Sequence, residues 1–371
     1  MTQSILQLIS AHTDAYSRGS GRLRHQLLQL DLPTGQAGSI NTIASLRHHL
    51  QTAIELEHST IPPYLCALYS INAQSNEFAY RTIQSVVMEE MLHMILAANI
   101  LNAIGGSPAI NKPKFIPEYP SYLPHSNDAF LVPLQKFSPA CLQVFLQIEQ
   151  PAVACAPPEA HHYATIGQFY AAIKQALCHL DSVTPGGIFT GEVGRQITPE
   201  HYYGGGGQLI SVHNLEDAIL AINEIIGQGE GMNGSIIDTD HVLFGEQIEY
   251  AHYFKYMEIL HERRYLPTDS AQLPPTGSAV QVNWSAVSNM QDNPKMSDYK
   301  KGSDLWQKTY EFNYSYMQLL NQLHSACNGE PPALMQAIPV MYDLKYKALE
   351  LMQIPTANGK MAGPSFEYVP I

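Results

Sequence analysis

Two segments of the sequence pair a glutamate with a histidine three residues later, a spacing that places both side chains on one face of a helix. Each pair interrupts an otherwise apolar helical stripe, and two further stripes each include a single glutamate. A buried carboxylate must be paired, protonated or bound to metal, because burying it alone costs several kcal/mol. The six residues are Glu57, Glu90, His93, Glu230, Glu249 and His252.

This combination predicts a dinuclear metal site. Helical bundles that bind two iron or two manganese ions take one glutamate from each of two helices and a Glu-x-x-His pair from each of the other two. Four carboxylates balance the charge of two divalent cations, and imidazole is a ligand suited to iron. We therefore expect two iron ions as the cofactor, with manganese as the other possible metal. The alternative is a set of buried ion pairs or helix-end charges without metal.

The choice of the third glutamate is open. Glu216 lies 33 residues before Glu249, the same separation as between Glu57 and Glu90, and fits the intervening turn better than Glu230 does. However, Glu216 stands in the first turn of its helix, where acidic side chains complement the helix dipole. Glu230 is therefore preferred and Glu216 is the second choice.

Glu149 is a further candidate, because it ends an apolar helix in the middle of the chain. We interpret it first as a cap or clamp of that segment, and second as a ligand that reaches the metal from above.

Apolar positions three and four residues apart predict the helices that would carry these residues. Asn41 or Thr42 can cap the first helix, and Pro62-Pro63 is expected to kink or break it. The second helix runs over 77–104, the third over 214–229 and the fourth over 241–263. Further helices are predicted over 138–150, 167–180, 303–327 and 332–352.

These elements predict a mainly α fold, a four-helix bundle with a large insert between helices 2 and 3 and extra C-terminal helices. We expect a division into an N-terminal helix and loop (1–38), bundle helices 1 and 2 (39–106), the insert (107–214), bundle helices 3 and 4 (215–265), and a linker with two helices packed on the bundle (266–371).

Composition narrows the possible partners. Of 371 residues only 14% are charged, and the formal net charge is -13, which argues against nucleic-acid binding.

The N-terminus lacks the features of a signal peptide, and no run of 18 apolar residues predicts a membrane span. Five cysteines without a CxxC pair fit a reducing cytoplasm. A homo-oligomer remains possible.

Several segments resemble the ferritin-like domain of the iminophenyl-pyruvate dimer synthase family: 55–65, 89–94, 98–106, 228–231, 251–254 and 362–368. Enzymes of that family oxidatively join two imines of indole-3-pyruvate or phenylpyruvate in bisindole pigment pathways. The resemblance implies a ferritin-like core with iron as the metal. It implies the same ligands as above, with Glu249 matching the family pattern less closely than the other five.

The function expected from these observations is that of an oxidase, acting with O2 or peroxide on a small organic substrate such as an imine or aromatic keto-acid derivative. The insert is expected to cover the metal centre and to wall a substrate pocket. Its candidate wall residues are Phe130, Phe137, Phe145, Phe169, Tyr202 and Tyr203. The alternatives are a metal-binding or storage protein without an organic substrate and a metal-free pathway scaffold.

Overall fold

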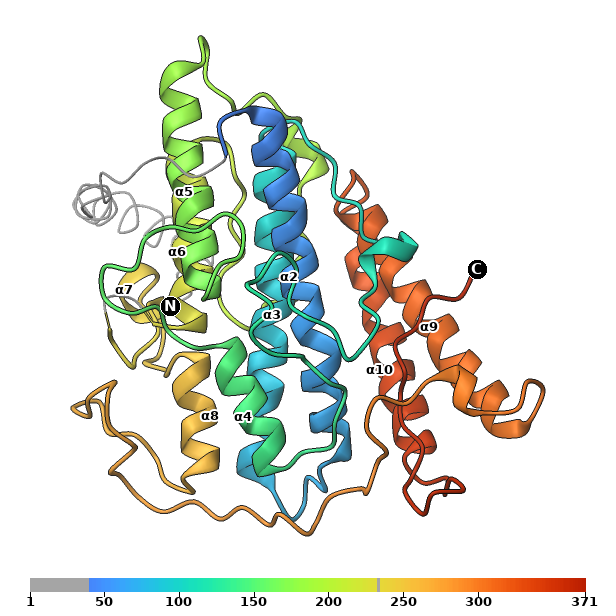
Figure 1. Cartoon of the computed structure of the whole chain (residues 1–371). Helices are drawn as coiled ribbons and strands as arrows, with labels where there is room; N and C mark the ends of the chain where they lie inside the picture. The colour runs from blue at the N-terminus through green and yellow to red at the C-terminus, as the bar shows by residue number, and fades with distance from the viewer. Residues whose placement is uncertain (1–39, 232–233) are drawn as a thin grey trace, which may run out of the picture. The chain divides into compact units, whose positions relative to one another are not determined.

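The computed structural model describes residues 40–231 and 234–371 (Figure 1). The predicted N-terminal helix and loop lie outside the described residues. Within the described ranges the chain forms helices, short 3-10 turns and isolated β-bridges, and it contains no extended strand. The predicted mainly α fold is therefore confirmed.

The centre of the molecule is a hairpin of two long helices, α2 (Ile43–Ser70) and α3 (Glu77–Ala103), which pack along each other (Figure 1). The Thr42 hydroxyl caps α2 by accepting a hydrogen bond from the Ser45 amide. The chain leaves α3 at Gly105, whose φ of +73° is a conformation that glycine adopts without steric cost. Both predicted helices are confirmed.

The prolines in α2 do not break the helix, which continues through Pro62 and Pro63 to Ser70. Proline lacks an amide hydrogen, so Pro63 leaves the Ser59 carbonyl without its usual helical donor. The Tyr119 hydroxyl from the insert donates to that carbonyl at 2.7 Å. The expected disruption is therefore limited, because a side chain replaces one of the two hydrogen bonds that the prolines remove.

Four shorter helices complete the bundle: α4 (Pro139–Ile148), α5 (Ile166–Val183), α6 (Leu215–Gly229) and α8 (His252–Leu260). In the view of Figure 1, α5 and α6 cover the upper half of the hairpin, and α4 and α8 cover the lower half. Helices α4 and α5 contact α2, whereas α6 and α8 contact α3. The insert thus supplies two helices to the bundle itself, in addition to its loops.

The prediction of a single helix over 241–263 is wrong for the residues before His252. A short helix, α7 (Asp240–Leu243), is followed by extended chain, and α8 begins only at His252. Gly245 has a φ of +76°, and the segment after it pairs with 236–237 through the Ala251 amide and an antiparallel bridge at Tyr250. These hydrogen bonds compete with helix formation, and the glycine permits the change of direction.

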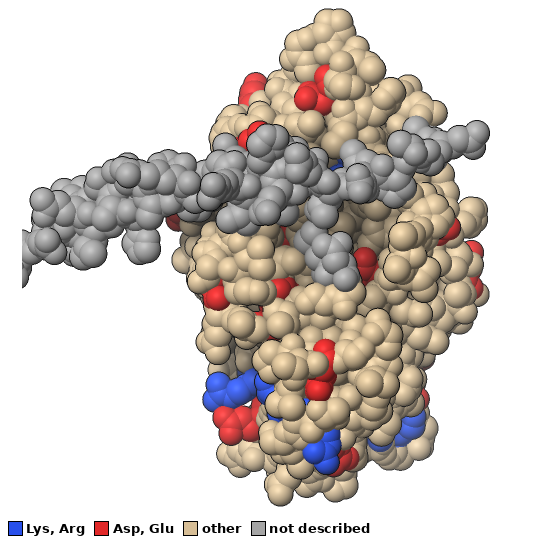
Figure 2. Space-filling view, turned by 90° about the vertical axis from the view of Figure 1, so that its left-hand side faces the viewer, with Lys and Arg blue, Asp and Glu red and all other residues tan. Residues whose placement is uncertain are grey.

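The C-terminal part forms a second helical hairpin, α9 (Asp304–Ala326) and α10 (Ala333–Leu351), which lies against α2 and α3 (Figure 1). The predicted helices here and in the insert are confirmed to within a few residues. The face drawn in Figure 2 carries few charged side chains outside the grey region, in keeping with the charge-poor composition.

Helix α3 is long and apolar enough to cross a membrane by length and composition, but 89% of its most apolar window is buried inside the protein. It is therefore the core helix of this fold.

Replacing Tyr119 with phenylalanine should lower the free energy of unfolding by about 1–3 kcal/mol, because the buried Ser59 carbonyl loses its donor. Chemical denaturation measures the difference. Tyr122→Phe is the matched control, since Tyr122 is exposed, and it should change stability by less than about 0.5 kcal/mol. Equal effects of the two substitutions would contradict the role assigned to Tyr119.

Candidate metal centre

Five buried side chains meet beside the middle of the α2–α3 hairpin, where the shorter helices end or begin. They form two overlapping groups, one of Glu57, Glu90 and His93 and the other of Glu90, Glu149 and His252. Within each group one ligand atom per residue lies within 4.8 Å of the others. Glu90 belongs to both groups, so the arrangement has the form of two adjacent sites that share a carboxylate.

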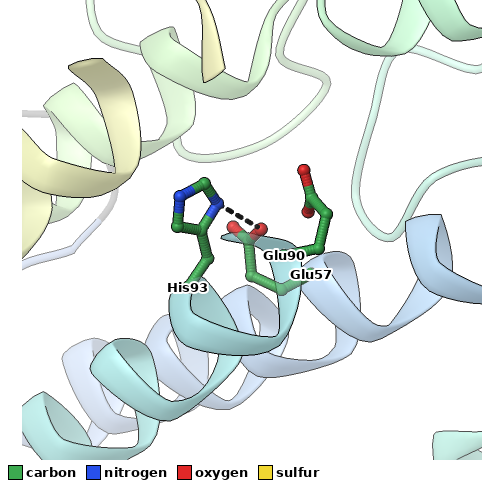
Figure 3. Close-up of side chains that lie close together, drawn as sticks. All are labelled: Glu57, Glu90 and His93. Carbon is green, nitrogen blue, oxygen red and sulfur yellow. Dashed lines mark ion pairs between the residues drawn. The ribbon is translucent and has the colours of Figure 1, made fainter. Parts of the chain in front are cut away.

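The first group is drawn in Figure 3, where the three side chains point toward one another from α2 and α3. His93 Nδ1 lies 3.6 Å from Glu57 Oε2, and His93 Nε2 lies 2.8 Å from Gln228 Oε1. The Gln228 amide nitrogen donates to the Gly206 carbonyl and to carboxylates, so its oxygen is the acceptor toward His93. His93 Nε2 therefore donates to Gln228, and Nδ1 is the nitrogen that faces Glu57.

His252 repeats this pattern on the other side of Glu90. Its Nδ1 lies 3.0 Å from Glu90 Oε1 and 3.4 Å from Glu149 Oε2, but it makes no hydrogen bond of good geometry. Its Nε2 lies 2.6 Å from Glu89 Oε2. Histidines that bind metals commonly donate their second nitrogen to such an outer partner, which fixes the ring orientation. Both imidazoles thus present Nδ1 to the carboxylates.

Glu89 is the outer partner of His252 rather than a member of the cluster. Lys255 donates two hydrogen bonds to its carboxylate, at 2.7 and 2.9 Å. Burial alone would raise the pKa of Glu89, but Lys255 and His252 outweigh it and lower that pKa to about 2. Glu89 is therefore ionised and holds the His252 ring in place.

Each carboxylate of the cluster accepts a hydrogen bond from one hydroxyl. Thr60 donates to Glu90 at 2.9 Å, Tyr64 donates to Glu149, and Tyr170 of α5 donates to Glu57. The roles of Tyr170 and Gln228 could not be predicted from the sequence, because their positions depend on how the insert and α6 pack against the hairpin.

Burial and repulsion by Glu149 disfavour the charged forms of Glu90 and of the nearby Glu230. Burial and the neighbouring Glu149 raise the pKa of Glu90 to about 8. Burial also raises the pKa of Glu230 to about 7, even though the Ala152 amide stabilises the charged form. For His252, burial lowers the pKa, but the carboxylates of Glu149, Glu89 and Glu90 raise it well above its usual value. The cluster therefore needs positive charge, from protons or from cations.

The structure brings together four of the six residues singled out from sequence, namely Glu57, Glu90, His93 and His252. Glu230 caps the C-terminus of α6 and accepts from the Ala152 amide at 2.8 Å, close to Glu149 but outside the two groups. The side chain of Glu249 is 52% exposed and pairs with Lys255 at 3.0 Å.

Glu216 is exposed in the first turn of α6. Glu149, interpreted first as a helix cap, does cap α4 and also faces the cluster. Glu149 thus takes the place beside Glu90 and His252 that the sequence had suggested for Glu249. Glu249 does not reach the cluster, because α8 begins only at His252.

One cavity adjoins the cluster, and a second adjoins the outer partners of its histidines. One of about 20 Å³ touches Glu149 and Glu230, and its other walls include Ile148, Ile166 and Ile225. The other is an open polar depression of about 510 Å³ that reaches Glu89 and Gln228 beside Gly204–Gly207.

The insert covers the cluster through α4 and α5, as expected, but its aromatic residues mainly fill the core. Phe145 packs on Tyr64 with ring centroids 4.5 Å apart, and Phe137 stacks on Trp284. An apolar cavity of about 60 Å³ lies elsewhere, between the α2–α3 hairpin and α9–α10, and includes none of the cluster.

Residues 50–261, more than half of the chain, match the family model described as Ferritin-like. The chain belongs to the ferritin-like family. A ferritin-like protein from Caulobacter vibrioides has a similar structure, with a TM-score of 0.57 over 87% of this chain and 99% of that one. Its sequence is 21% identical, so this similarity supports the fold.

Two curated relatives of this ferritin-like chain are enzymes of the iminophenyl-pyruvate dimer synthase family, so the predicted resemblance is confirmed. Dichlorochromopyrrolate synthase of Lentzea aerocolonigenes is 26% identical over 77% of this chain and 29% of its own length. The 2-imino-3-(indol-3-yl)propanoate dimerase of Chromobacterium violaceum is 26% identical over 58% of this chain and 23% of its own. The chain thus spans less than a third of either relative.

The substitution Glu149→Gln should reduce the number of metal ions that the candidate metal centre binds, because one of its two groups loses an anionic ligand. Elemental analysis after anaerobic loading with ferrous iron measures the loss. Glu249→Gln is the control and should bind as much iron as the unaltered protein. If Glu249→Gln loses iron and Glu149→Gln does not, the assignment made from the structure is wrong.

Replacing Gln228 with methionine should weaken iron binding by about 10–100-fold, the usual effect of removing an outer partner of a histidine ligand. Competition with a chelator of known affinity measures the change. Gln291→Met is a control, since Gln291 is also buried but its side chain bonds to Asp298, Tyr299 and Asn358. Unchanged affinity in Gln228→Met would show that His93 does not need this partner.

Proposed function

We propose that this protein is a dinuclear non-haem iron oxidoreductase that oxidises a small imine or aromatic keto-acid derivative with O2 or peroxide. The observation that carries the proposal is the pair of buried Glu/His groups that share Glu90. This arrangement offers two adjacent positions where cations could bind. The Nδ1 atoms of His93 and His252 face these positions, and imidazole nitrogen suits iron better than magnesium or calcium.

The residues present fit two metal ions. His252 Nδ1 is buried, lacks a hydrogen-bond partner and faces two carboxylates, as expected of a ligand atom. Glu57 and His93 would hold one ion, Glu149 and His252 the other, with Glu90 between them. When bound, iron would supply the electron-transfer chemistry; manganese would suit the same carboxylates.

The surrounding side chains orient these ligands and exclude water. Tyr170, Thr60 and Tyr64 each hold one carboxylate in place through a hydroxyl group. The Lys255–Glu89 pair fixes His252 and keeps a positive charge next to the cluster. Rigid support of this kind keeps a site in its reactive geometry during the reaction.

The substrate class rests on the relatives, one of which is named as a dimerase of an indolyl imino acid. Joining two imino acids through a carbon–carbon bond removes two electrons and two protons. Hydrogen peroxide can accept both and yield two water molecules. The polar depression beside Glu89 and Gln228 is the approach that we assign to the substrate, because the cavity at Glu149 has room for about one water molecule.

A metal-binding protein without an organic substrate is the second candidate. The same depression is lined by Glu89, Asp238, Asp240, Glu246 and Glu249, which would attract cations, and the space at the cluster itself is small. The two candidates differ in whether oxidation of the metal is coupled to an organic product. All five cysteines are free thiols, which fits the reducing cytoplasm proposed as the location.

The protein loaded anaerobically with ferrous iron should bind about two ions per chain. With indole-3-pyruvate, ammonium and peroxide it should form the coupled dimer, detected by mass spectrometry. Glu90→Gln should lose both properties, whereas Glu55→Gln should keep them, since Glu55 bonds to Gln51 away from the cluster.

Iron binding followed by oxidation without any coupled or otherwise oxidised organic product would favour the second candidate. Binding of less than half an ion per chain would rule out both.

A further inference from the structure

A second group of potential ligands lies outside the carboxylate cluster. His48 and His49 stand in the first turns of α2, and His125 and His161 lie on two loops of the insert. Their imidazole rings are neighbours: five of the six centroid separations are 5.7, 5.5, 6.4, 4.8 and 5.4 Å. His49 precedes Glu57 by eight residues, about 12 Å along the helix, so this group is separate from the candidate metal centre.

His49 is buried at the base of the group, and its hydrogen bonds fix its tautomer. Nδ1 lies 2.8 Å from the Ser45 carbonyl, which can only accept, so Nδ1 carries the hydrogen. Nε2 therefore presents a lone pair, yet it is buried without a hydrogen-bond partner. A histidine that donates one nitrogen to a backbone carbonyl and leaves the other free is oriented as a metal ligand. A buried acceptor without a donor is otherwise unfavourable.

Four of these five ring separations lie close to the spacing expected of a tetrahedral imidazole site. With a metal–nitrogen distance of about 2.0–2.1 Å, each ring centroid lies about 3.2 Å from the metal, which places the centroids about 5.2 Å apart. The observed separations scatter around that value. In this structure the ring nitrogens of the four histidines do not point at one common position. Among the described residues, only the carboxylate cluster brings ligand atoms of three residues within 4.8 Å of one another. His48, His125 and His161 are exposed, so their side chains can rotate toward the fixed Nε2 of His49.

Backbone hydrogen bonds join the loop that carries His125 to the loop that carries His161. His125 has a φ of +59°, an uncommon conformation for a residue other than glycine. Its carbonyl accepts a hydrogen bond from the His162 amide at 2.8 Å, and Ser126 forms a bridge with Tyr163. Burial lowers the pKa of both His49 and His125, and the neighbouring imidazoles lower it further, which favours the neutral form that binds metals.

We propose that His48, His49, His125 and His161 form a binding site for one divalent late transition-metal ion, of which zinc is the representative. An all-imidazole set suits zinc, nickel and copper, whereas the carboxylate-rich cluster suits iron. The ion would tie the two loops of the insert to α2. Helix α5 begins five residues after His161, and its Tyr170 contacts Glu57, so the ion would also anchor the helix that supports the candidate metal centre.

The test compares zinc binding by four purified full-length proteins: Glu90→Gln, Glu90→Gln with His125→Asn and His161→Asn, Glu90→Gln with His162→Asn, and the unaltered chain. Glu90→Gln weakens the carboxylate cluster and so isolates the histidine site. Asparagine is chosen because it tolerates the positive φ of His125 and His162. His162 is the matched control: it is exposed and adjacent to His161, but it takes part in none of the ring pairs that join the four histidines.

Glu90→Gln and its His162→Asn derivative should each bind one zinc ion per chain, and cobalt in place of zinc should give the visible absorption of a tetrahedral site. The derivative lacking His125 and His161 should lose that ion, and zinc should no longer raise its melting temperature. Circular dichroism without metal should be the same for the three proteins that carry Glu90→Gln, since the histidines replaced in two of them are exposed.

Equal zinc binding with and without His125 and His161 would overturn the proposal. So would a similar loss in His162→Asn, which would indicate non-specific binding by surface histidines, or the absence of a bound ion in Glu90→Gln. None of these results depends on whether the protein oxidises an organic substrate.

Discussion

The negative charge gathered around Glu90 is the constraint on which the arrangement of the bundle depends. Glu57, Glu90 and Glu149 are all nearly inaccessible to solvent, and Glu90 lies within reach of both of the others. Carboxylates so placed repel one another and lose hydration, so the fold must supply compensation from every side. Two imidazoles and three hydroxyl groups contact the carboxylates directly. The ammonium group of Lys255 acts from farther away, through its ion pair with Glu89.

The discontinuous helices follow from this constraint. Helix α4 ends at Glu149, α6 ends at Glu230 and α8 begins at His252, all beside the unbroken hairpin. A side chain at a helix end can turn inward without displacing an apolar residue from the helical stripe. Two helix C-termini also direct the negative ends of their dipoles toward this region, which favours a cation there. The breaks thus admit polar groups from several directions into an otherwise apolar bundle.

Much of the centre could be predicted from the sequence where helices are regular. Glu57, Glu90 and His93 interrupt clear apolar stripes on α2 and α3, and the structure brings them together. The reasoning failed at Glu249, because it assumed one continuous helix, whereas Gly245 and the pairing of Tyr250 with Ile237 keep that segment extended.

Glu149 was ranked too low for a related reason. Periodicity shows that α4 is a helix but does not show which other helices it packs against. Tyr170 and Gln228 carry no local signal of their role, since each acts on a residue more than a hundred positions away in the chain. The boundaries of regular helices could therefore be read from the sequence, whereas contacts between the insert and the hairpin required the three-dimensional structure.

The apolar cavity between the α2–α3 hairpin and the α9–α10 pair has a consequence for the response to hydrostatic pressure. It has a volume of about 60 Å³, and leucine, isoleucine, methionine and aromatic side chains form most of its walls, together with Pro62 and His58. Because the volume decrease on unfolding scales with the internal void that is eliminated, separation of the two hairpins would reduce the volume of the system. Compression should therefore loosen the C-terminal hairpin from the bundle before it disturbs the densely bonded centre around Glu90.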